Sequence, residues 1–557
     1  MDALIILILC AFRLLSVFAV QTFFSPDEYW QSLEVAHKMI FGFVLCLVSG
    51  SIKINFSDSR YGHETWEWKQ GIRSYLYPAI ISGVYKVLAV LGVDSVSVLI
   101  FAPRILQALI SAYSDYRFYK WCNKSKWSLF IIMTSWFWFY TGSRTLINSL
   151  EASLITIIFS FFPWGKSGKN RQSQQCNLVG LKLIFLNDSE STGFLWISIL
   201  LAYIRPTSVI TLLPLWLHHI TKSRYSIGEL FWKRYAFLGI LICAMMITLD
   251  SYFHGSTIAV PYEFFKANIL NNVSGFYGTH PFYWYFTSGL PAILGVNLIP
   301  LSFAILDFFR NFSASKSRQT IFASIFLTVL IYSLIPHKEF RFLLQILPLC
   351  LYIISKYLSE WSRKQSEMTI WFAALVILVS NAVPAGYLGY VHQQGTVKVM
   401  DTVADIAKNY KAESGLAPKI FFMMPCHSTP YYSHVHANIT MRFLKCEPNL
   451  NNKADYVDEA DKFYDSPMKW IRTHLPVHPI EALPTHIVIF DSLAPKISDF
   501  LSIYQPKHVH FHADFLSHAR GGKNVIIFER MNVANKNKEK NPSGEALKKE
   551  SGTKQEL

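Results

Sequence analysis

Two acidic residues and one cationic hexapeptide are the groups in this sequence best suited to chemistry. Asp27 and Glu28 follow Pro26, directly after the first apolar run. Residues 337–342 (HKEFRF) place three side chains that can carry a positive charge around one carboxylate, between two further apolar runs. Charges at a membrane boundary are costly, so they usually have a partner or a ligand. The acids suit a base that acts on a hydroxyl, and the cations suit an anionic phosphate.

The acids also have a structural interpretation. Ser25 and Pro26, with two acids in the first turn, suit the start of a helix, so capping alone would explain them. Our hypothesis is that Asp27 is a catalytic base and that Glu28 is its partner or the base itself. Both interpretations can hold at once.

The hexapeptide allows two interpretations as well. It is either a group of interfacial charges that ends a membrane span, or a tight turn at one membrane face whose cations bind a phosphate. In the second case we predict Lys338 and Arg341 as phosphate ligands, with Glu339 as the counter-ion that orients them. His337 then binds the phosphate or caps the turn, and the sequence does not separate these roles.

Aromatic and polar residues elsewhere are candidates for binding sugar. Trp66, Glu67 and Arg73 would form a platform on which a pyranose stacks while the carboxylate binds its hydroxyls. The alternative for Trp66 is the aromatic belt of a membrane interface. The remaining candidates are Arg205 for phosphate, and His280 and His427 for sugar or acceptor.

Composition indicates the setting that positions these residues. Of 557 residues, 52% are hydrophobic and only 16% charged, which is typical of a polytopic α-helical membrane protein. The net charge of +15 comes from short clusters between apolar runs, at residues 117–126, 166–171, 222–234, 310–318 and 356–364. This is positive-inside topology, and no nucleic-acid motif accompanies it.

Twelve apolar runs are long enough to consider as spans. If residues 76–93 form a juxtamembrane helix instead, every basic cluster lies on one face, which leaves about 11 transmembrane helices. The amino terminus is then cytosolic, and Asp27, His280 and His337 share the opposite face. Arg13, inside the first span, should pair with a group on a neighbouring helix.

We therefore expect five parts. They are a first transmembrane helix at 1–24, a non-cytosolic catalytic loop with juxtamembrane helices at 25–95, the remaining bundle at 96–390, a small non-cytosolic α/β domain at 391–530, and a disordered tail at 531–557. Strands are expected at 420–424, 487–490 and 525–528. A disulfide between Cys426 and Cys446 is left open. We predict no metal, because no ligand spacing accompanies the alternating histidines of 508–512.

Acids and cations on one membrane face indicate a type of reaction. Substitution at a sugar carbon whose leaving group is a lipid phosphate needs a base for the hydroxyl and cations for the phosphate. A general acid is unnecessary, because the phosphate leaves as an anion. Gly-rich loops for nucleotide sugars are absent from the sequence.

Motifs in widely separated loops resemble those of one known family, and they occur in the family's order along the chain. They lie at residues 26–34 (PDEYWQSLE), 65–68 (TWEW), 73–75 (RSY), 205–207 (RPT), 280–281 (HP) and 337–342. This set resembles the dolichol-phosphate-mannose-dependent mannosyltransferases of glycosyltransferase family 22, which have the GT-C fold. Asp27 occupies the position of the family's catalytic acidic residue.

The resemblance also implies a substrate and a location. Residues 26–34, 276–281 and 424–434 are most similar to the members that add the third, α1,2-linked mannose to the GPI precursor. It implies an inverting transfer from a β-linked lipid donor, without a cofactor, at the lumenal face of the endoplasmic reticulum membrane. The lipid substrates and the membrane are the implied partners. The alternatives are the fourth GPI mannose, the lipid-linked N-glycan precursor and, in another class, a lipid or solute transporter.

One segment departs from the family pattern. Residues 43–60 intervene where the pattern otherwise runs on almost directly from 37–42 to 61–64. The segment contains no residues to which we assign chemistry. It lies between Asp27 and Trp66 in the sequence.

Overall fold

The computed structural model describes residues 2–42, 47–48, 51–52, 62–164, 193–223, 225–311, 315–414, 416–450, 453–475, 479–516 and 519–531. The chain divides into two compact units. The membrane unit comprises Met1–Val391 with Pro430–His434, and the C-terminal unit comprises His392–Thr429 with Val435–Leu557. Most of the expected insertion at 43–60 and the tail after 531 lie outside the described residues.

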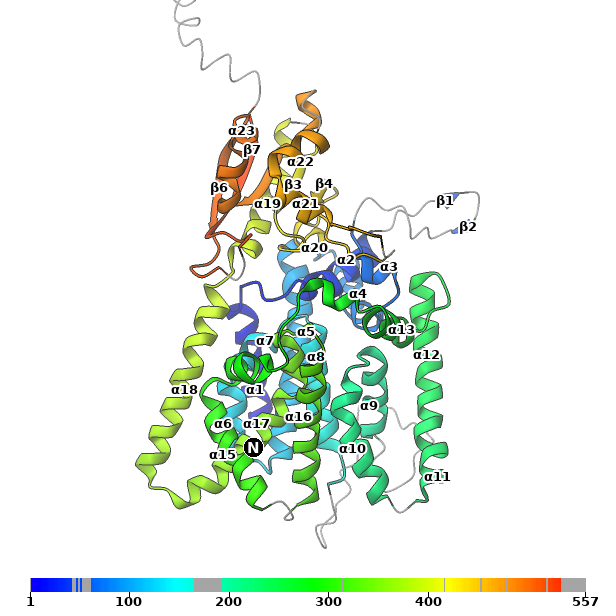
Figure 1. Ribbon diagram of the computed structural model, residues 1–557, viewed down its shortest axis with the longest axis vertical. Helices are drawn as coiled ribbons and strands as arrows, with labels where there is room; N and C mark the ends of the chain where they lie inside the picture. Colours follow the sequence, from blue (N-terminus) through cyan, green and yellow to red (C-terminus); the bar gives the residue numbers. More distant parts are fainter. Residues whose placement is uncertain are drawn as a thin grey trace, which may run out of the picture. The chain divides into compact units, whose positions relative to one another are not determined.

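The membrane unit is helical (Figure 1). Among the described residues, six helical segments have the length and hydropathy of a membrane span: Asp2–Ala19, Val96–Trp121, Ile227–His254, Tyr285–Arg310, Lys316–Leu334 and Glu367–Tyr410. Shorter apolar helices lie at Leu76–Val90, Ile147–Phe161 and Gly193–Ile204. The expectation of a polytopic helical membrane protein is confirmed, and the number of about 11 spans stays a prediction.

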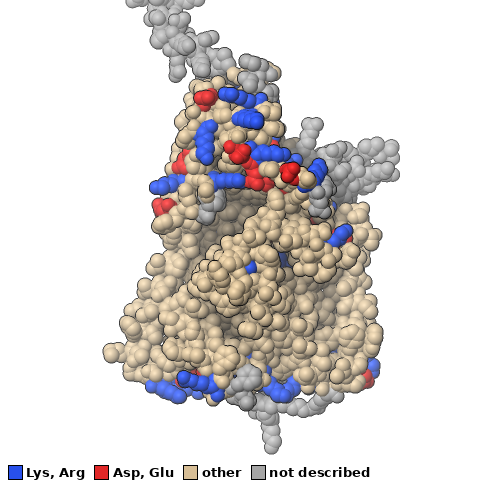
Figure 2. Space-filling model, viewed as in Figure 1, with Lys and Arg blue, Asp and Glu red and all other residues tan. Residues whose placement is uncertain are grey.

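The helices of this unit, in chain order, are α1 (Asp2–Ala19), η1 (Tyr29–Leu33), α2 (Glu34–Phe41), α3 (Trp66–Lys69), α4 (Leu76–Val90), α5 (Val96–Trp121), α6 (Lys126–Thr134), α7 (Trp136–Thr141), α8 (Ile147–Phe161), α9 (Gly193–Ile204), α10 (Ser208–Lys222), α11 (Ile227–Leu230), α12 (Phe237–His254), α13 (Val260–Phe265), α14 (Leu290–Leu294), α15 (Leu298–Arg310), α16 (Lys316–Leu334), α17 (Leu347–Trp361) and α18 (Glu367–Tyr390). The short helices η4 (Val273–Tyr277) and η8 (Phe340–Gln345) lie beside the candidate site. Figure 2 shows a broad uncharged band on this unit with Lys and Arg along its lower edge, as positive-inside topology predicts.

One expected span is interrupted. The apolar run from Trp127 to Thr141 forms two helices, α6 and α7, which are separated at Ser135. The amide of Trp136 donates to the side chain of Asn381, on α18, at 3.2 Å. The side chain of Asn381 thus accepts a hydrogen bond from a backbone amide that the break leaves without an intrahelical partner.

Arg13 has the partner that the sequence predicts. Its Nε donates a 2.6 Å hydrogen bond to Asp115 of α5, and another nitrogen donates to the carbonyl of Trp138 at 3.0 Å. The indole of Trp138 donates to the same carboxylate at 2.7 Å. Arg13 and Asp115 are almost fully buried, so the expectation of a paired intramembrane arginine is confirmed.

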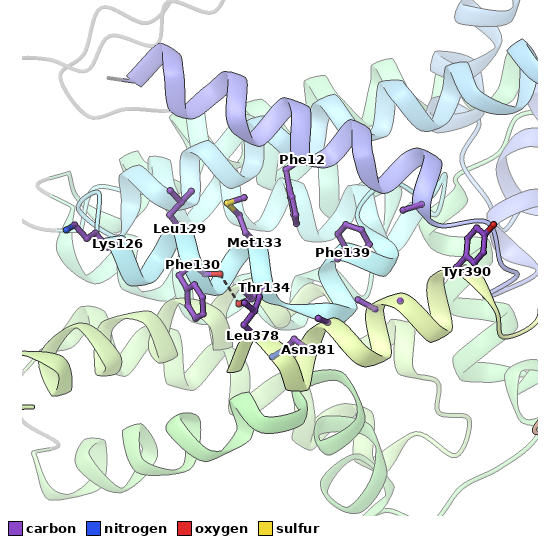
Figure 3. A pocket seen from close by; sticks show the side chains of 14 residues that line it. Phe12, Lys126, Leu129, Phe130, Met133, Thr134, Phe139, Leu378, Asn381 and Tyr390 are labelled. Atoms are coloured by element: carbon purple, nitrogen blue, oxygen red, sulfur yellow. Dashed lines mark hydrogen bonds between the residues drawn. The ribbon is translucent and has the colours of Figure 1, made fainter. Parts of the chain in front are cut away.

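An apolar cavity of about 960 Å³ lies between α1, α6, α7 and α18. Figure 3 shows Phe12, Phe139 and Leu378 along it, with Lys126 at one end and Tyr390 at the other. The polar atoms of Thr134 and Asn381, within its lining, are bonded to other protein groups. None of the expected site residues lines this cavity.

The C-terminal unit contains a five-stranded mixed sheet in the order β4-β3-β5-β7-β6. Its strands are β3 (Lys419–Phe422), β4 (Thr440–Phe443), β5 (His486–Phe490), β6 (Tyr504–Phe511) and β7 (Asn524–Arg530). Strand β3 is parallel to β4 and β5, while β7 is antiparallel to β5 and β6. The larger helices are α19 (Gly395–Ser414), α21 (Glu459–Asp465) and α22 (Pro467–His474), and a short helix lies at α23 (Ser498–Leu501). The short helix α20 (Tyr432–Val435) has its first three residues in the membrane unit.

The three expected strands correspond to β3, β5 and β7, whereas β4 was not anticipated. The alternation of His508 and His510, which indicated a solvated strand face, falls on β6. Strand β6 is mostly exposed, so its sequence lacks the apolar run that marks the other strands. Cys426 and Cys446 are joined by a disulfide, with their Cα atoms 5.9 Å apart. This pairing settles the bond that the sequence left open.

Candidate active site

The first residues after α1 form a turn that leads into a π-helix. The amides of Tyr29 and Trp30 donate to the carbonyl of Pro26 at 3.0 and 2.9 Å. The hydroxyl of Ser25 is buried and has no hydrogen-bond partner among the described residues, so it does not cap the helix. The π-helix η1 follows at once, a rare geometry that is frequent at functional sites. The segment thus places Asp27 just before η1.

Asp27 and the hexapeptide meet in one ion-pair cluster. The guanidinium of Arg341 contacts the carboxylate of Asp27 and donates a 2.5 Å hydrogen bond to Glu339. Burial disfavours the charge on Arg341, but the two carboxylates outweigh this effect and raise its pKa. Burial would likewise raise the pKa of Glu339, yet Arg341 and His337 lower it to about 2. Arg341 and Glu339 are therefore both held in their charged forms.

Two further arginines border this cluster. Arg73 approaches Glu67 at 4.0 Å. Burial lowers the pKa of Arg73, Asp27 and Glu67 oppose that shift, and the nearby Arg205 and Arg341 reinforce it. Four charged side chains thus act electrostatically on Arg73. Together with Arg73 they come from five separate sequence motifs.

Two of these arginines retain unused donors. The Nε atoms of Arg73 and Arg341 are buried and have no hydrogen-bond partner among the described residues. Buried polar groups in native proteins are almost always satisfied, so such donors indicate a ligand with acceptor oxygens. A phosphate has that chemistry, and it matches arginine geometry well.

Arg205 has a carboxylate partner that the sequence did not single out. Its Nε lies 3.5 Å from Glu151 of α8, which is only 1% exposed. Asn148 donates to the same carboxylate oxygen at 3.3 Å. A lone carboxylate inside an apolar run is the signal that would have identified Glu151.

Glu28 faces away from this cluster. Its carboxylate accepts a 2.7 Å hydrogen bond from Arg144, and both side chains are almost fully buried. Arg144 also donates to the carbonyl of Thr22 at 2.7 Å. The pair fixes the turn that carries Asp27. Arg144 was missed because a cation between two apolar runs has no motif of its own.

The other cations of the hexapeptide bind backbone. Lys338 donates to the carbonyls of Ile335 and His280 at 2.5 and 3.1 Å. The ring of His337 lies 3.0 Å from the carbonyl of Gly278 and 2.9 Å from Glu339. The amide of His280 donates to Pro336 at 2.9 Å. These bonds tie residues 278–280 to residues 335–338.

The predicted sugar-binding residues lie in different surroundings. Trp66 is 6% exposed and donates to the hydroxyl of Tyr277 at 2.7 Å. Glu67 accepts from Gln31 at 3.1 Å and lies near Arg73. The ring of His280 stacks on Trp284 at 5.0 Å. Of the predicted sugar-binding residues, Glu67 and Arg73 adjoin the cluster around Asp27.

His427 belongs to the C-terminal unit. It lies between β3 and β4 with a backbone φ of 58°, and its ring packs against Phe443 at 5.4 Å. Cys426, His427 and Cys446 lie close together, but the two cysteines form a disulfide and so are not metal ligands. The expected role of His427 in binding the acceptor stays a prediction.

Comparison with known proteins identifies the family of this chain. The profile of the Alg9-like mannosyltransferase family matches residues 4–46 and 56–436. The chain belongs to this family. The match omits residues 47–55, which lie within the expected insertion at 43–60. For the mannosyltransferase described here, the expected family is thus confirmed.

Relatives and a solved structure place this mannosyltransferase more closely. It is 48% identical to GPI mannosyltransferase 3 of Drosophila melanogaster over 92% of this chain and 84% of that protein. It is 36% identical to human GPI alpha-1,2-mannosyltransferase 3, over 94% and 87% of the two chains. The crystal structure of ArnT from Cupriavidus metallidurans, bound to undecaprenyl phosphate, covers 95% of this chain and 98% of its own, with a TM-score of 0.55 at 10% identity. The last match confirms the GT-C fold.

Proposed function

We propose that this mannosyltransferase adds the third mannose, in α1,2 linkage, to the GPI-anchor precursor, with dolichol-phosphate-mannose as donor. The observation that carries the proposal is the cluster of Asp27, Arg341, Arg73 and Arg205. Arg341 contacts the Asp27 carboxylate, Arg73 interacts electrostatically with Asp27 and Arg205, and the Nε atoms of Arg73 and Arg341 have no hydrogen-bond partner among the described residues. The near-full-length similarity to GPI mannosyltransferase 3 proteins supports the choice of acceptor.

In the reaction, Asp27 accepts the proton of the acceptor hydroxyl as that oxygen attacks C1 of the donor mannose. The bond between C1 and the phosphate oxygen breaks, and the configuration inverts from β to α. The released dolichyl phosphate is an anion, so its departure needs positive charge and no proton. Arg341, Arg73 and Arg205 supply that charge from a preorganised, buried position.

Arg341 has a double role in this scheme. In the free site its guanidinium is shared between Asp27 and Glu339. A donor phosphate that binds the unused Nε joins this network, while Glu339 keeps the guanidinium in place. The ArnT structure that shares the fold holds undecaprenyl phosphate, and the proposed donor has a polyprenyl phosphate of the same class.

We assign the other predicted residues to supporting roles. Glu28 holds the turn through Arg144, so Asp27 is our candidate for the base. Lys338 and His337 anchor the loop at 278–280 beside the donor site. Glu67 is our candidate for binding sugar hydroxyls, since Gln31 and Arg73 fix its position. We place the reaction at the lumenal face of the endoplasmic reticulum membrane.

Mass analysis of GPI intermediates tests this function. Cells that lack the protein should accumulate the two-mannose GPI precursor, and the wild-type chain should remove it. Asp27→Ala should be expressed at the normal level and leave the precursor in place. Normal GPI with truncated N-glycan precursors would exclude the proposed acceptor, and accumulation of a three-mannose precursor would point to the fourth mannose. Purified protein that moves the lipid donor across liposomes without transferring mannose would indicate a transporter.

A further inference from the structure

A fully buried carboxylate lies one helix away from the candidate base. Glu34, the first residue of α2, is inaccessible to solvent. Its carboxylate accepts hydrogen bonds from the amide of Tyr431 at 2.9 Å, from the amide of Ser433 at 3.2 Å and from the hydroxyl of Ser433 at 2.5 Å. Every donor comes from Pro430–His434, a segment that belongs to the membrane unit although it is distant in sequence. We call this segment the strap.

The donors match an ionised carboxylate. An ionised carboxylate only accepts hydrogen bonds, and the strap presents backbone amides and one hydroxyl to it. Burial raises the pKa of Glu34 to about 7, while Ser433 and the backbone amides of the strap act in the opposite direction. An unpartnered carboxylate would be far more costly in this position, so Glu34 and the strap depend on each other.

Ring contacts extend this interface onto the π-helix η1. The ring of Trp30 stacks on Tyr431 with centroids 5.2 Å apart. Tyr29 meets the edge of His434 at 5.3 Å, and the ring of His434 bonds the hydroxyl of Ser433 at 2.8 Å. One face of η1 is thus packed against the strap.

The π-helix η1 also adjoins the candidate site. Asp27 lies two residues before η1, and Gln31, within η1, donates to Glu67 at 3.1 Å. Ser32 donates to the carbonyl of Thr145 at 2.7 Å. Because a π-helix is intrinsically unfavourable, its geometry depends on such surrounding contacts. A change at the strap should therefore reach both Asp27 and Glu67.

We propose that Glu34 is a positioning residue, which anchors the strap to α2 and thereby holds η1 so that Asp27 and Glu67 keep their places in the site. Glu34 touches neither substrate nor reacting atoms in this scheme. The inference rests on the proposed function, because its readout is mannose transfer. The inference adds Glu34 to the residues on which the reaction depends. Glu34 has no assigned substrate contact, yet its loss should impair the chemical step.

A double-mutant cycle in the purified full-length enzyme tests the proposal. The variants are Glu34→Gln, Ser433→Ala and the double substitution. Ser428→Ala is the matched control, because that hydroxyl also belongs to the loop between β3 and β4 but donates to Pro425, at 2.5 Å, within the C-terminal unit. The assay measures kcat, the KM for dolichol-phosphate-mannose and the melting temperature of each variant.

We expect Glu34→Gln to lower kcat by about 10²-fold, the loss typical of a misplaced catalytic group, with little change in the donor KM. Ser433→Ala should lower kcat less, because the backbone amide donors of the strap remain. The double variant should resemble Glu34→Gln alone, since both changes remove one interaction. Ser428→Ala should behave like the wild type.

Three results would overturn the proposal. The first is a folded Glu34→Gln variant with the wild-type kcat, and the second is a double variant whose loss of kcat equals the product of the two single losses. The third is a lowered amount of folded protein that accounts for the whole loss of activity. If Glu34→Gln does not fold, Ser433→Ala alone decides, and a wild-type kcat for it also overturns the proposal. Failure of the proposed function looks different, because the wild type and Ser428→Ala would then transfer no mannose to the two-mannose acceptor.

Discussion

The carboxylate of Asp27 is paired with the guanidinium of Arg341, although the two residues are more than half the chain apart. The pair joins the acidic motif after the first helix to the cationic motif before α17. A base and a leaving-group ligand in direct contact allow proton removal and phosphate departure to occur within one site. The following predictions test this pairing and the contacts that hold it.

Replacement of Arg341 by lysine should lower kcat/KM by about 10²-fold. Lysine keeps the charge, but a single ammonium cannot contact Asp27 and Glu339 as a planar guanidinium does, and it lacks the free Nε. Steady-state transfer with varied donor concentration measures the effect. Arg318→Lys is the control, because Arg318 forms a separate pair with Asp307. Equal rates for both variants would remove Arg341 from phosphate binding.

Glu28→Gln should impair folding. The substitution leaves the charge of Arg144 buried without its partner, which typically costs about 3–5 kcal/mol. Thermal unfolding of the detergent-solubilised protein measures the loss. Glu229→Gln breaks an exposed pair with Lys233 and should leave the melting temperature unchanged. An unaltered melting temperature in Glu28→Gln would show that the buried pair does not hold the turn.

The loop at 276–281 should become less protected as pH rises. Burial lowers the pKa of His337, but Glu339 and the carbonyl of Gly278 outweigh it, so the pKa is raised above 6.5. The charged ring favours the folded loop. Its contribution is complete below pH 6.5 and is lost as pH rises through the raised value. Hydrogen exchange of these amides, corrected for the intrinsic rate, measures this change. His337→Asn should remove the pH dependence, and persistence of the same dependence would assign it to another group.

Loss of the disulfide should destabilise the C-terminal unit. Cys426 and Cys446 close a loop with a sequence separation of 20, for which removal typically costs about 2–4 kcal/mol. Thermal unfolding of Cys426→Ser with Cys446→Ser, followed by a probe in that unit, gives the measurement. Cys243→Ser, an exposed free thiol, serves as control. A double variant as stable as the control would contradict the expected contribution.

The sequence predicted which motifs meet, but not all of their contacts. Asp27 and Arg341 were recognisable because charges at a membrane boundary need partners. The partner of Lys338 was not, since it binds the carbonyls of His280 and Ile335, and backbone acceptors have no sequence signature. Likewise, Glu28 was paired with Arg144 only by the fold.

Secondary structure was predictable where local pattern and burial agree. Apolar runs marked β3, β5 and β7, while the mostly exposed β6 has no apolar run and was indicated only by its alternating histidines. The break between α6 and α7 depends on an acceptor from Asn381 of α18. The strap shows the same limit, because only tertiary contact reveals that Glu34 and Ser433 meet.

Transfer by purified protein tests the central claim most directly. The wild type and Asp27→Asn should be supplied with dolichol-phosphate-mannose and a two-mannose GPI acceptor, and the product linkage determined. We predict an α1,2-linked third mannose from the wild type and a rate lower by about 10²–10⁴-fold for folded Asp27→Asn, the range for loss of a positioned base. An undiminished rate in Asp27→Asn, or a different linkage or acceptor in the wild type, would contradict the account.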